Sequence, residues 1–238
     1  MIVKVAVDLP QIEPLAYMLD AVFSEKDIVG TWVLVPIRNK LMLGLITEVI
    51  KSFTANFKLK KIHSIVTHLP KSDKHWLALV HFSSKYYHKS LGQTAFTSVP
   101  RCLKEVKTYV TERKTSKIEK LLNQLDKTKF NNHNFADLSL NSDQKNAVEK
   151  ILNSTKPTLL HGVTGSGKTR VYAKLIQQTF IKNPNSQILL LVPEIGLTPQ
   201  ALQNMSKMLN GLEINLFHSE QTPNLRAMIW LSSLKGNP

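Results

Sequence analysis

The sequence contains a single cysteine, Cys102, among 238 residues. One thiol can form neither an internal disulfide nor a thiolate-rich zinc cluster, so we expect no zinc site in this chain and a reducing compartment such as the cytoplasm. No run approaches the roughly eighteen apolar residues that a membrane-spanning helix needs, and no basic segment followed by a long apolar one opens the chain. We therefore expect neither secretion nor a membrane partner.

Acidic residues are also scarce. Seventeen Asp and Glu stand against 31 Lys and Arg, which gives a formal charge of +14. The excess is spread along the chain, since residues 1–137 hold 21 basic and 12 acidic residues (+9) and residues 138–238 hold 10 and 5 (+5). Such a charge indicates a polyanionic partner, with nucleic acid first and a highly charged solvated surface as the alternative.

The first hundred residues favour strands. Apolar, β-branched runs at 2–7, 32–36 and 41–50 predict three strands, with a turn at residues 38–40 between the last two. A helix is predicted over 73–87, where apolar residues recur at helical spacing after Asp73. We interpret Trp32, Trp76 and Phe82 as core residues, with base stacking as the alternative. Residues 1–100 thus predict a small β-rich domain.

Residues 101–138 are rich in Lys, Glu, Thr and Asn, and we interpret them as a charged linker in which only 117–125 forms a short amphipathic helix. Strands and helices then alternate over residues 139–238. The predicted strands are 157–161, 187–192 and 213–217, and the predicted helices are one capped by Asn141 or Ser142, then 169–181, 197–209 and 225–234. This order indicates an α/β unit with a parallel sheet and crossover helices.

The segment HGVTGSGKT carries the chemistry, because it matches G-x-x-x-x-G-K-[ST] between an apolar run and an amphipathic helix. Backbone N–H groups of such a loop point at phosphate oxygens, and side chains on Gly162, Gly165 or Gly167 would obstruct them. Lys168 is expected to place its charge on the β and γ phosphates, and Thr169 to bind Mg²⁺ through its hydroxyl. The expected cofactors are therefore ATP and Mg²⁺.

Two further segments are candidate ligand contacts. Gln144 lies just inside a capped helix, and its amide offers the donor and acceptor that read the N6 and N7 edge of adenine, with a solvated side chain as the alternative. After the apolar run at 187–192, Gly196 and Thr198 sit where an α/β sheet places ligand contacts, and they are expected to hold a nucleic-acid backbone. An ordinary strand-to-helix connection is the alternative there.

At these residues the chain resembles the bacterial PriA-type replication-restart helicases, the primosomal protein N-prime family. The matching strings are LNSDQ (140–144), LLHGVTGSGKT (159–169), VPEIGLTPQ (192–200), His218-Ser219, Arg226 with Trp230, and, nearer the amino terminus, VPI-R-NK (35–40), GLITEV (44–49), YYH (86–88) with Leu91-Gly92, and SVP (98–100). The resemblance implies a β-rich DNA-binding domain followed by a partial RecA-like P-loop helicase lobe. It implies an ATP-dependent 3′-to-5′ DNA helicase (an ATP hydrolase) that recognises stalled forks, 3′ ends and single strands. The implied partners are other primosome proteins and single-strand-binding protein.

The resemblance also assigns residues. A nucleotide site is implied at Gln144, Gly162, Val163, Thr164, Gly165, Ser166, Gly167, Lys168, Thr169 and Arg170, with Lys168 and Thr169 catalytic. Contacts to single-stranded DNA are implied at Val192, Pro193, Glu194, Gly196 and Thr198. A pocket for the 3′ end of a DNA strand is implied at Leu15, Ala16, Tyr17, Arg38 and Lys60, where Tyr17 is expected to stack on a base.

This sequence departs from the family pattern at several of these positions. Leu15 and Ala16 stand where an aromatic residue and an Asp are usual, Arg38 replaces a small residue, and Arg170 replaces an acid. The segment between the two domains is short, so we expect the family's winged-helix domain to be missing or vestigial. Because the chain stops at Pro238 without a DExH-like motif, a second motor lobe or the cysteine-rich zinc region, we expect a fragment that binds nucleotide and DNA without unwinding.

Three hypotheses follow for function. The first is the leading part of an ATP-dependent DNA helicase, and the second is a DNA-end binding module without ATPase activity. The third is a small P-loop kinase or unrelated NTPase, which would act on nucleotide independently of DNA. The five histidines between His63 and His88 lack carboxylate or thiolate partners at regular spacing, and we interpret them as surface residues instead of metal ligands.

Overall fold

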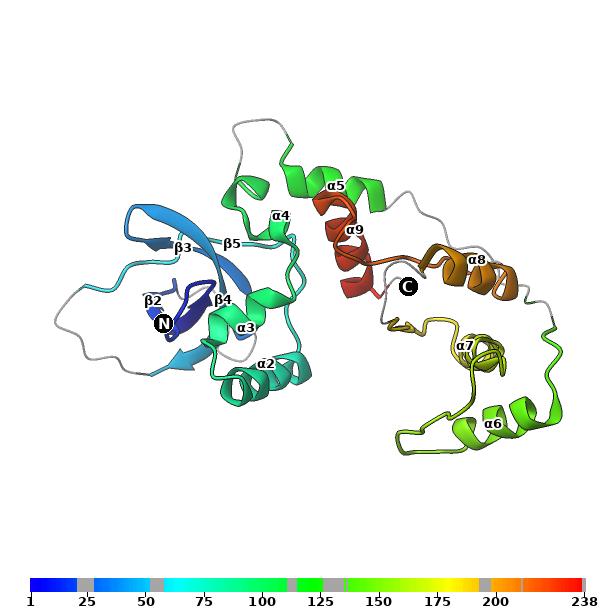
Figure 1. The fold of residues 1–238 in the computed structure, drawn as a ribbon. Coiled ribbons are helices and arrows are strands. Elements are labelled where there is room, and N and C mark those ends of the chain that lie inside the picture. Colours follow the sequence, from blue (N-terminus) through cyan, green and yellow to red (C-terminus); the bar gives the residue numbers. More distant parts are fainter. Residues whose placement is uncertain are drawn as a thin grey trace. The chain divides into compact units, whose positions relative to one another are not determined.

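The computed structural model describes residues 1–20, 28–51, 58–110, 115–125, 135, 137–192, 198–210 and 212–236 (Figure 1). The chain divides into two compact units. Unit 1 comprises Met1–Lys127 and Glu220–Lys235, and unit 2 comprises Thr128–Ser219 and Gly236–Pro238. Unit 1 is thus built from two stretches of sequence that unit 2 separates.

Unit 1 contains a five-stranded sheet with the order β2-β1-β4-β3-β5, in which every neighbouring pair is antiparallel. Its strands are β1 (Ile2–Val7), β2 (Leu15–Met18), β3 (Trp32–Ile37), β4 (Lys40–Ile50) and β5 (Ser64–Ile65). The three strands predicted from apolar runs are confirmed as β1, β3 and β4. The predicted turn is also confirmed, because β3 and β4 form a hairpin in which Ile37 pairs with Lys40.

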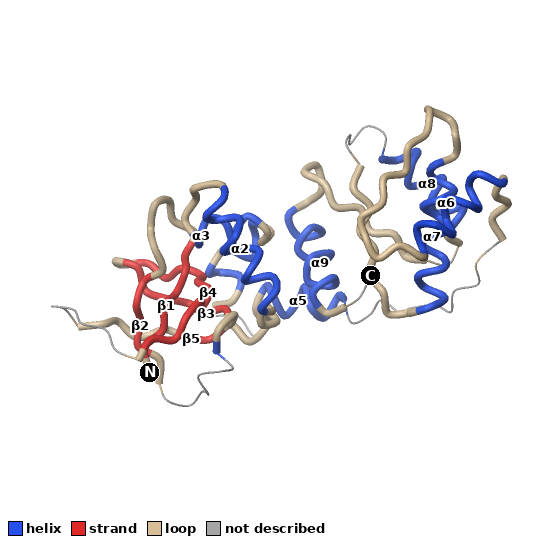
Figure 2. Tube along the Cα trace, turned by 90° about the horizontal axis from the view of Figure 1, so that it is seen from below, coloured by secondary structure: helices blue, strands red, loops and turns tan. Residues whose placement is uncertain are grey.

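The sheet of unit 1 is buried on both faces, because successive residues of a strand point to opposite sides. On β3, Trp32 and Leu34 belong to one apolar cluster while Val33 and Val35 belong to another. The first cluster continues into α2 (Lys74–Tyr86) and α3 (Leu91–Thr97), which lie beside the sheet (Figures 1 and 2). This double burial explains why β3 reads as a continuous apolar run instead of an alternating one.

Individual residues determine where α2 begins and how closely α3 packs against β1. Asp73 caps α2, as predicted, by accepting from the amides of His75 and Trp76. A Cβ atom on Gly92 would lie 1.8 Å from the carbonyl oxygen of Val7, so only glycine lets α3 come this close to β1. Trp32 is buried and Trp76 packs against the same cluster, but Phe82 is 63% exposed, so its interpretation as a core residue is wrong.

The linker expected at 101–138 is wrong over its first part. Residues 101–110 and 115–125 include α4 (Arg101–Lys104), the 3-10 turn η1 (Val106–Thr108) and α5 (Lys117–Leu125), which exists over the predicted residues but belongs to unit 1. Leu103, Ile118 and Leu121 are buried in the cluster beneath the sheet. The reason is spacing: apolar residues three to four apart place one face of α5 in the core despite the charged residues between them.

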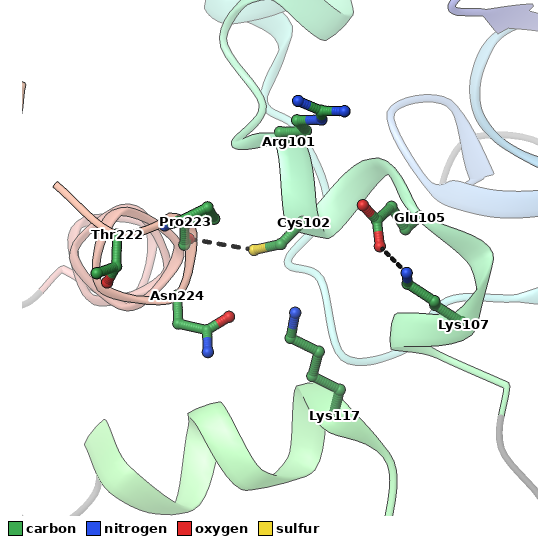
Figure 3. A pocket seen from close by; sticks show the side chains of 8 residues that line it. All are labelled: Arg101, Cys102, Glu105, Lys107, Lys117, Thr222, Pro223 and Asn224. Atoms are coloured by element: carbon green, nitrogen blue, oxygen red, sulfur yellow. Dashed lines mark hydrogen bonds and ion pairs between the residues drawn. The ribbon is translucent and has the colours of Figure 1, made fainter. Parts of the chain in front are cut away.

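The helix predicted over 225–234 is confirmed as α9 (Pro223–Leu234), but it joins unit 1 instead of the carboxyl-terminal domain. Ala227 and Leu231 of α9 lie in the same cluster as Ile118 and Leu121 of α5. The start of α9, α4 and the start of α5 surround a hollow of about 370 Å³ (Figure 3). There the Cys102 thiol donates to the carbonyl oxygen of Pro223 at 3.2 Å, and Lys107 pairs with Glu105 at 3.0 Å.

Unit 2 contains three helices among its described residues: α6 (Ser142–Leu152), α7 (Lys168–Lys182) and α8 (Thr198–Met208). The predicted helix capped by Asn141 or Ser142 is confirmed as α6, and the bounds predicted for α7 and α8 are correct to within one residue. Its described apolar core is small and is formed by Ala173, Met205 and Leu209 with partly buried neighbours. Gln177 adds a polar contact, because its side-chain amide donates to the carbonyl oxygen of Met208 at 3.1 Å.

The strands predicted at 157–161, 187–192 and 213–217 are wrong, because the described residues of unit 2 contain no strand. Leu159 is 89% exposed, and Leu189 and Leu191 are each 81% exposed. The physical reason is that a parallel strand makes all its ladder bonds to strands distant in sequence, whereas a hairpin strand finds its partner across a short turn. An apolar run therefore predicts a strand reliably only where its partner is local.

In the part of the chain that the structure describes, no helix has the length and apolar character required to cross a bilayer. The same residues include no cluster of three or more His, Cys, Asp or Glu side chains arranged to hold a metal ion.

Candidate functional site

The P-loop sequence of unit 2 forms a turn that leads directly into α7. Gly165 and Gly167 both have φ +82°, in the left-handed region that favours glycine, and Gly167 is the N-cap of α7. The amide of Ser166 donates to the carbonyl oxygen of Val163 at 3.2 Å and closes the turn. Backbone geometry therefore favours glycine at Gly165 and Gly167, and the expectation that side chains there would obstruct phosphate binding stays a prediction.

Close packing also disfavours a side chain at two of the glycines. A Cβ atom on Gly162 would lie 2.8 Å from Oγ of Ser166, and one on Gly167 would lie 2.4 Å from Nε2 of Gln144. A Cβ on Gly165 would meet nothing within 4 Å. Gly165 is thus required for its dihedral angles alone, whereas Gly167 is required for both its dihedral angles and its contact with Gln144.

The Lys168 amine lies over the loop. Its Nζ donates to the carbonyl oxygens of Gly162 at 2.7 Å and of Val163 at 3.0 Å. These carbonyls hold a cation at the mouth of a turn that precedes the positive end of a fifteen-residue helix. Thr169, in the first turn of α7, is exposed. Three groups therefore fit a triphosphate with Mg²⁺: the Lys168 ammonium, the start of α7 and the hydroxyl of the exposed Thr169.

Gln144 connects α6 to this loop. Its Oε1 accepts from the amide of Asn141 at 3.1 Å, while Oδ1 of Asn141 accepts from the amide of Gln144 at 2.8 Å, which completes a capping box. Its Nε2 donates to the carbonyl oxygen of Ser166 at 3.0 Å. The side chain predicted to read adenine thus lies beside the loop, with its oxygen and its nitrogen both bonded to the protein.

Arg170 supplies a second connection between α7 and the segment before α6. Its guanidinium donates to the carbonyl oxygen of Ser139 at 3.0 Å. Ser139 was not singled out from the sequence, because nothing in its neighbours distinguishes it from an ordinary linker serine. Together, Arg170 and Gln144 hold residues 139–144 against the P-loop.

Most of the residues expected to contact DNA after the P-loop lie outside the described residues. Val192, the last residue of the apolar segment 187–192, is about half exposed. Pro193, Glu194 and Gly196 lie outside the described residues, and Thr198 begins α8. Their assignment to single-stranded DNA stays a prediction.

The second candidate site, in unit 1, joins three segments that the sequence separates. Leu15, Ala16 and Tyr17 lie on β2, Arg38 lies in the β3–β4 turn, and Lys60 follows β4. Lys60 accepts from the amide of Met18 through its carbonyl oxygen at 2.9 Å and donates through Nζ to the carbonyl oxygen of Arg38 at 3.2 Å. The Tyr17 hydroxyl donates to the carbonyl oxygen of Pro36 at 3.2 Å. Of the five residues predicted to form a DNA-end pocket, Tyr17, Arg38 and Lys60 are therefore brought together, while Leu15 and Ala16 precede Tyr17 on the same strand.

Tyr17 plays a different part from the one predicted. Its side chain is only 4% exposed and belongs to the apolar cluster with Val33 and Val35, so the ring has no open face on which a base could stack. Burial raises the pKa of the Tyr17 hydroxyl, which keeps it protonated and donating. The stacking prediction is wrong because alternation along β2 turns residue 17 toward the core and leaves residues 16 and 18 on the other face.

Arg38 has an uncommon backbone conformation. Its φ is +51°, in the left-handed region that a small residue adopts at less cost. The side chain is exposed, and none of the ion pairs within the described residues involves it. A guanidinium held on a tight turn beside the Lys60 amine makes this rim cationic.

Comparison with known proteins divides the chain at the same place as the sequence pattern. Residues 4–100 match a 3′DNA-binding domain (3′BD) family, named for PriA, and residues 137–229 match a family described as type III restriction enzyme, res subunit. The second match fits a partial RecA-like lobe. The fold class is therefore a small β-rich domain followed by a P-loop unit, although the described part of unit 2 lacks the expected parallel sheet.

Several curated proteins are similar to this chain, and each is called replication restart protein PriA. The one from Rickettsia conorii is 31% identical over 231 residues, which cover 96% of this chain and 32% of that protein. The one from Helicobacter pylori strain J99 is 33% identical over 202 residues, 84% of this chain and 28% of that protein. The one from Haemophilus influenzae is 42% identical over 95 residues, 39% of this chain and 13% of that protein. The chain spans about a third of the length of the first of these relatives.

Proposed function

Because this chain corresponds in sequence to the amino-terminal third of replication restart proteins PriA, we propose that it binds DNA ends and ATP as the leading part of a restart helicase. Unit 1 binds the 3′ end of a DNA strand, and unit 2 binds ATP with Mg²⁺. The whole protein is then an ATP-dependent 3′-to-5′ DNA helicase of the cytoplasm that acts at stalled forks with other primosome proteins and single-strand-binding protein.

One observation carries the nucleotide half of this proposal. The Lys168 amine sits on the carbonyl oxygens of Gly162 and Val163, at the mouth of a loop that left-handed glycines shape. An arriving triphosphate offers better acceptors than neutral carbonyls, so the amine exchanges one set of oxygens for the other with little movement. Thr169 would hold Mg²⁺ through its hydroxyl, and the start of α7 would face the phosphates.

In this proposal the protein supplies binding and orientation, and Mg²⁺ supplies the charge that neutralises the phosphate oxygens. Gln144 reads the base from the position that it already occupies beside Ser166. Its amide oxygen keeps a second lone pair and its amide nitrogen a second proton, so Gln144 can pair with adenine while it keeps its bonds to Asn141 and Ser166.

The DNA half rests on the match of residues 4–100 and on the meeting of β2, the β3–β4 turn and Lys60. A strand end reaching this rim meets the cationic side chains of Arg38 and Lys60. Contacts of Val192, Pro193, Glu194, Gly196 and Thr198 with single-stranded DNA are part of the same proposal.

The nucleotide proposal is tested by Lys168→Ala, with Lys182→Ala as the matched control because Lys182 is exposed in the last turn of the same helix. Affinity for a fluorescent ATP analogue with Mg²⁺ is measured by titration. We expect Lys168→Ala to weaken binding at least about tenfold and the control to leave it unchanged, since only the first removes a charge-assisted contact. Equal affinity in both variants would contradict the phosphate site.

The DNA proposal is tested by competition between linear and circular single strands of equal length and sequence, over a salt titration. Attraction to the backbone alone weakens equally for both as salt rises. We expect the linear strand to bind more tightly throughout. A chain that shows this end preference but binds no nucleotide would support the alternative, a DNA-end binding module without ATPase activity.

A further inference from the structure

The DNA-end rim of unit 1 has an unusual charge composition. The three segments that meet there, residues 15–18, 36–40 and 58–62, contain no Asp or Glu. They contain five cationic residues: Arg38, Lys40, Lys58, Lys60 and Lys61. A site composed in this way is suited to a group that brings more negative charge than a phosphodiester alone.

Among the described residues, the carboxylates that flank these segments are already engaged or distant. Asp20 pairs with Lys61 at 3.0 Å, and Glu48 pairs with Lys4, the cross-strand neighbour of Ala16, at 3.1 Å. Glu13 precedes β2, at the opposite end of that strand from the Met18–Lys60 contact. A terminal 3′ hydroxyl donates a hydrogen bond, and none of the three segments offers a carboxylate to accept it.

Two backbone carbonyls of the rim already accept a side-chain donor. The carbonyl oxygen of Pro36 accepts from the Tyr17 hydroxyl, and that of Arg38 accepts from the Lys60 amine. The second of these bonds fixes one proton of the Lys60 ammonium on the turn and leaves its other two donors for a ligand. The guanidinium of Arg38 projects from the same turn and can bind two oxygens of one phosphate.

We propose that this rim selects a DNA strand that ends in a 3′ phosphate over one that ends in a 3′ hydroxyl. The inference deepens the DNA-end function proposed above and rests on it. A terminal phosphate monoester carries about −1.5 to −2 charges at neutral pH and offers three acceptor oxygens, which match the donors of Arg38 and Lys60. A hydroxyl terminus can donate one hydrogen bond and accept from Arg38 or Lys60, but it brings no negative charge to these cationic residues.

The experiment uses the whole chain and four labelled single strands of one sequence: linear with a 3′ hydroxyl, linear with a 3′ phosphate, linear with a 5′ phosphate and a 3′ hydroxyl, and circular. Binding is followed by fluorescence anisotropy near physiological salt. We expect the 3′ phosphate to bind about tenfold more tightly than the 3′ hydroxyl, the effect of roughly one added charge-assisted contact. The 5′ phosphate should bind as the 3′ hydroxyl does.

The outcomes separate this inference from the function on which it rests. If the circular strand binds as tightly as all linear strands, the DNA-end function fails. If linear strands bind more tightly than the circle but the 3′ hydroxyl equals or exceeds the 3′ phosphate, only the present inference fails. An equal gain from the 5′ phosphate would also overturn it, because the gain would then reflect total charge alone.

Variants locate the effect. Arg38→Gly removes the guanidinium and suits the left-handed backbone, and Lys60→Gln removes the ammonium; each should erase most of the preference for the 3′ phosphate. Lys74→Gln, at the exposed start of α2, is the control and should keep it. Ala16→Asp adds an acceptor and a negative charge and should shift preference toward the hydroxyl. A full preference retained in both Arg38→Gly and Lys60→Gln, with native tryptophan emission, would contradict the assignment to this rim.

Discussion

In both unit 1 and unit 2, apolar runs between turn residues predict strands. The structure contains these strands in unit 1 but not in the described residues of unit 2. In unit 1 the runs became β1, β3 and β4, buried on both faces. In unit 2 the runs at 187–192 and around Leu159 are exposed, and only the helices appear as expected. An apolar run therefore indicates residues that favour burial. Whether they become a buried strand depends on how far away in the sequence the partner strand lies.

The two units also place their candidate chemistry differently. The candidate DNA-end rim joins β2, the β3–β4 turn and residues 58–62 through hydrogen bonds, whereas the P-loop region is held by four side-chain contacts to carbonyl oxygens, two from Lys168 and one each from Gln144 and Arg170. All three tryptophans, Trp32, Trp76 and Trp230, lie in unit 1. Tryptophan emission therefore reports on unit 1 alone, and nucleotide binding serves as the probe of unit 2.

The largest loss of stability is expected from Trp32→Ala, which tests the burial of the sheet in unit 1. Trp32 is 2% exposed and stacks edge-on against Phe96, with ring centroids 5.5 Å apart. Its loss should lower the free energy of unfolding of unit 1 by about 3–5 kcal/mol. Urea unfolding followed through Trp76 and Trp230 measures this. Phe82→Ala, at an exposed aromatic residue, is the control and should change stability by less than about 0.5 kcal/mol.

The variant Leu231→Ala tests whether α9 belongs to unit 1. Leu231 is 1% exposed in the cluster that α5 shares, so its truncation should destabilise the tryptophan-reported transition by about 2–5 kcal/mol. Leu234→Ala, at a residue 44% exposed in the same helix, should have little effect. If Leu231→Ala left that transition unchanged and weakened nucleotide binding instead, α9 would belong to unit 2, as the sequence pattern had indicated.

Within the P-loop, two glycine substitutions should differ. Gly167→Ala incurs both a left-handed backbone, about 1–2 kcal/mol, and a clash with Gln144, whereas Gly165→Ala incurs the backbone cost alone. We expect nucleotide affinity to fall further for Gly167→Ala. Titration with a fluorescent ATP analogue compares the two. Equal losses would mean that the contact between Gln144 and the loop does not shape the site.

The smallest effect is expected from Leu189→Asp. Because Leu189 is 81% exposed, the charge should change stability by less than about 0.5 kcal/mol. Far-ultraviolet circular dichroism during urea unfolding of wild type and variant measures this. A loss of several kcal/mol would show that 187–192 is buried in a sheet after all, and the contrast between the two units would disappear.

Much of the fold could be predicted because its signals are local. Helix spacing and caps found α2, α6 and α7, and the β3–β4 hairpin was marked by its turn. The short β2 and β5 were missed because four and two residues give no period to count. The helix α3 was missed although Ser90 and Gln93 stand at capping distance, a signal that was available.

The candidate sites show the same limit. The P-loop could be predicted because its ligand contacts come from consecutive residues, and the structure adds the loop geometry. The neighbour Ser139 could not be assigned to it, because its contact with Arg170 depends on how α6 and α7 meet. The burial of Tyr17 follows from the register of β2, which is set by pairing with β1.

The split composition of unit 1 affects how the chain folds during synthesis. Residues 1–127 leave the ribosome well before α9, and at about 5–20 residues per second the missing helix follows roughly 5–20 s later. During that interval the apolar faces of Cys102, Ile118 and Leu121 lack their cover. A nascent chain at this stage is a natural client for a chaperone that shields exposed apolar surface until translation delivers the last helix.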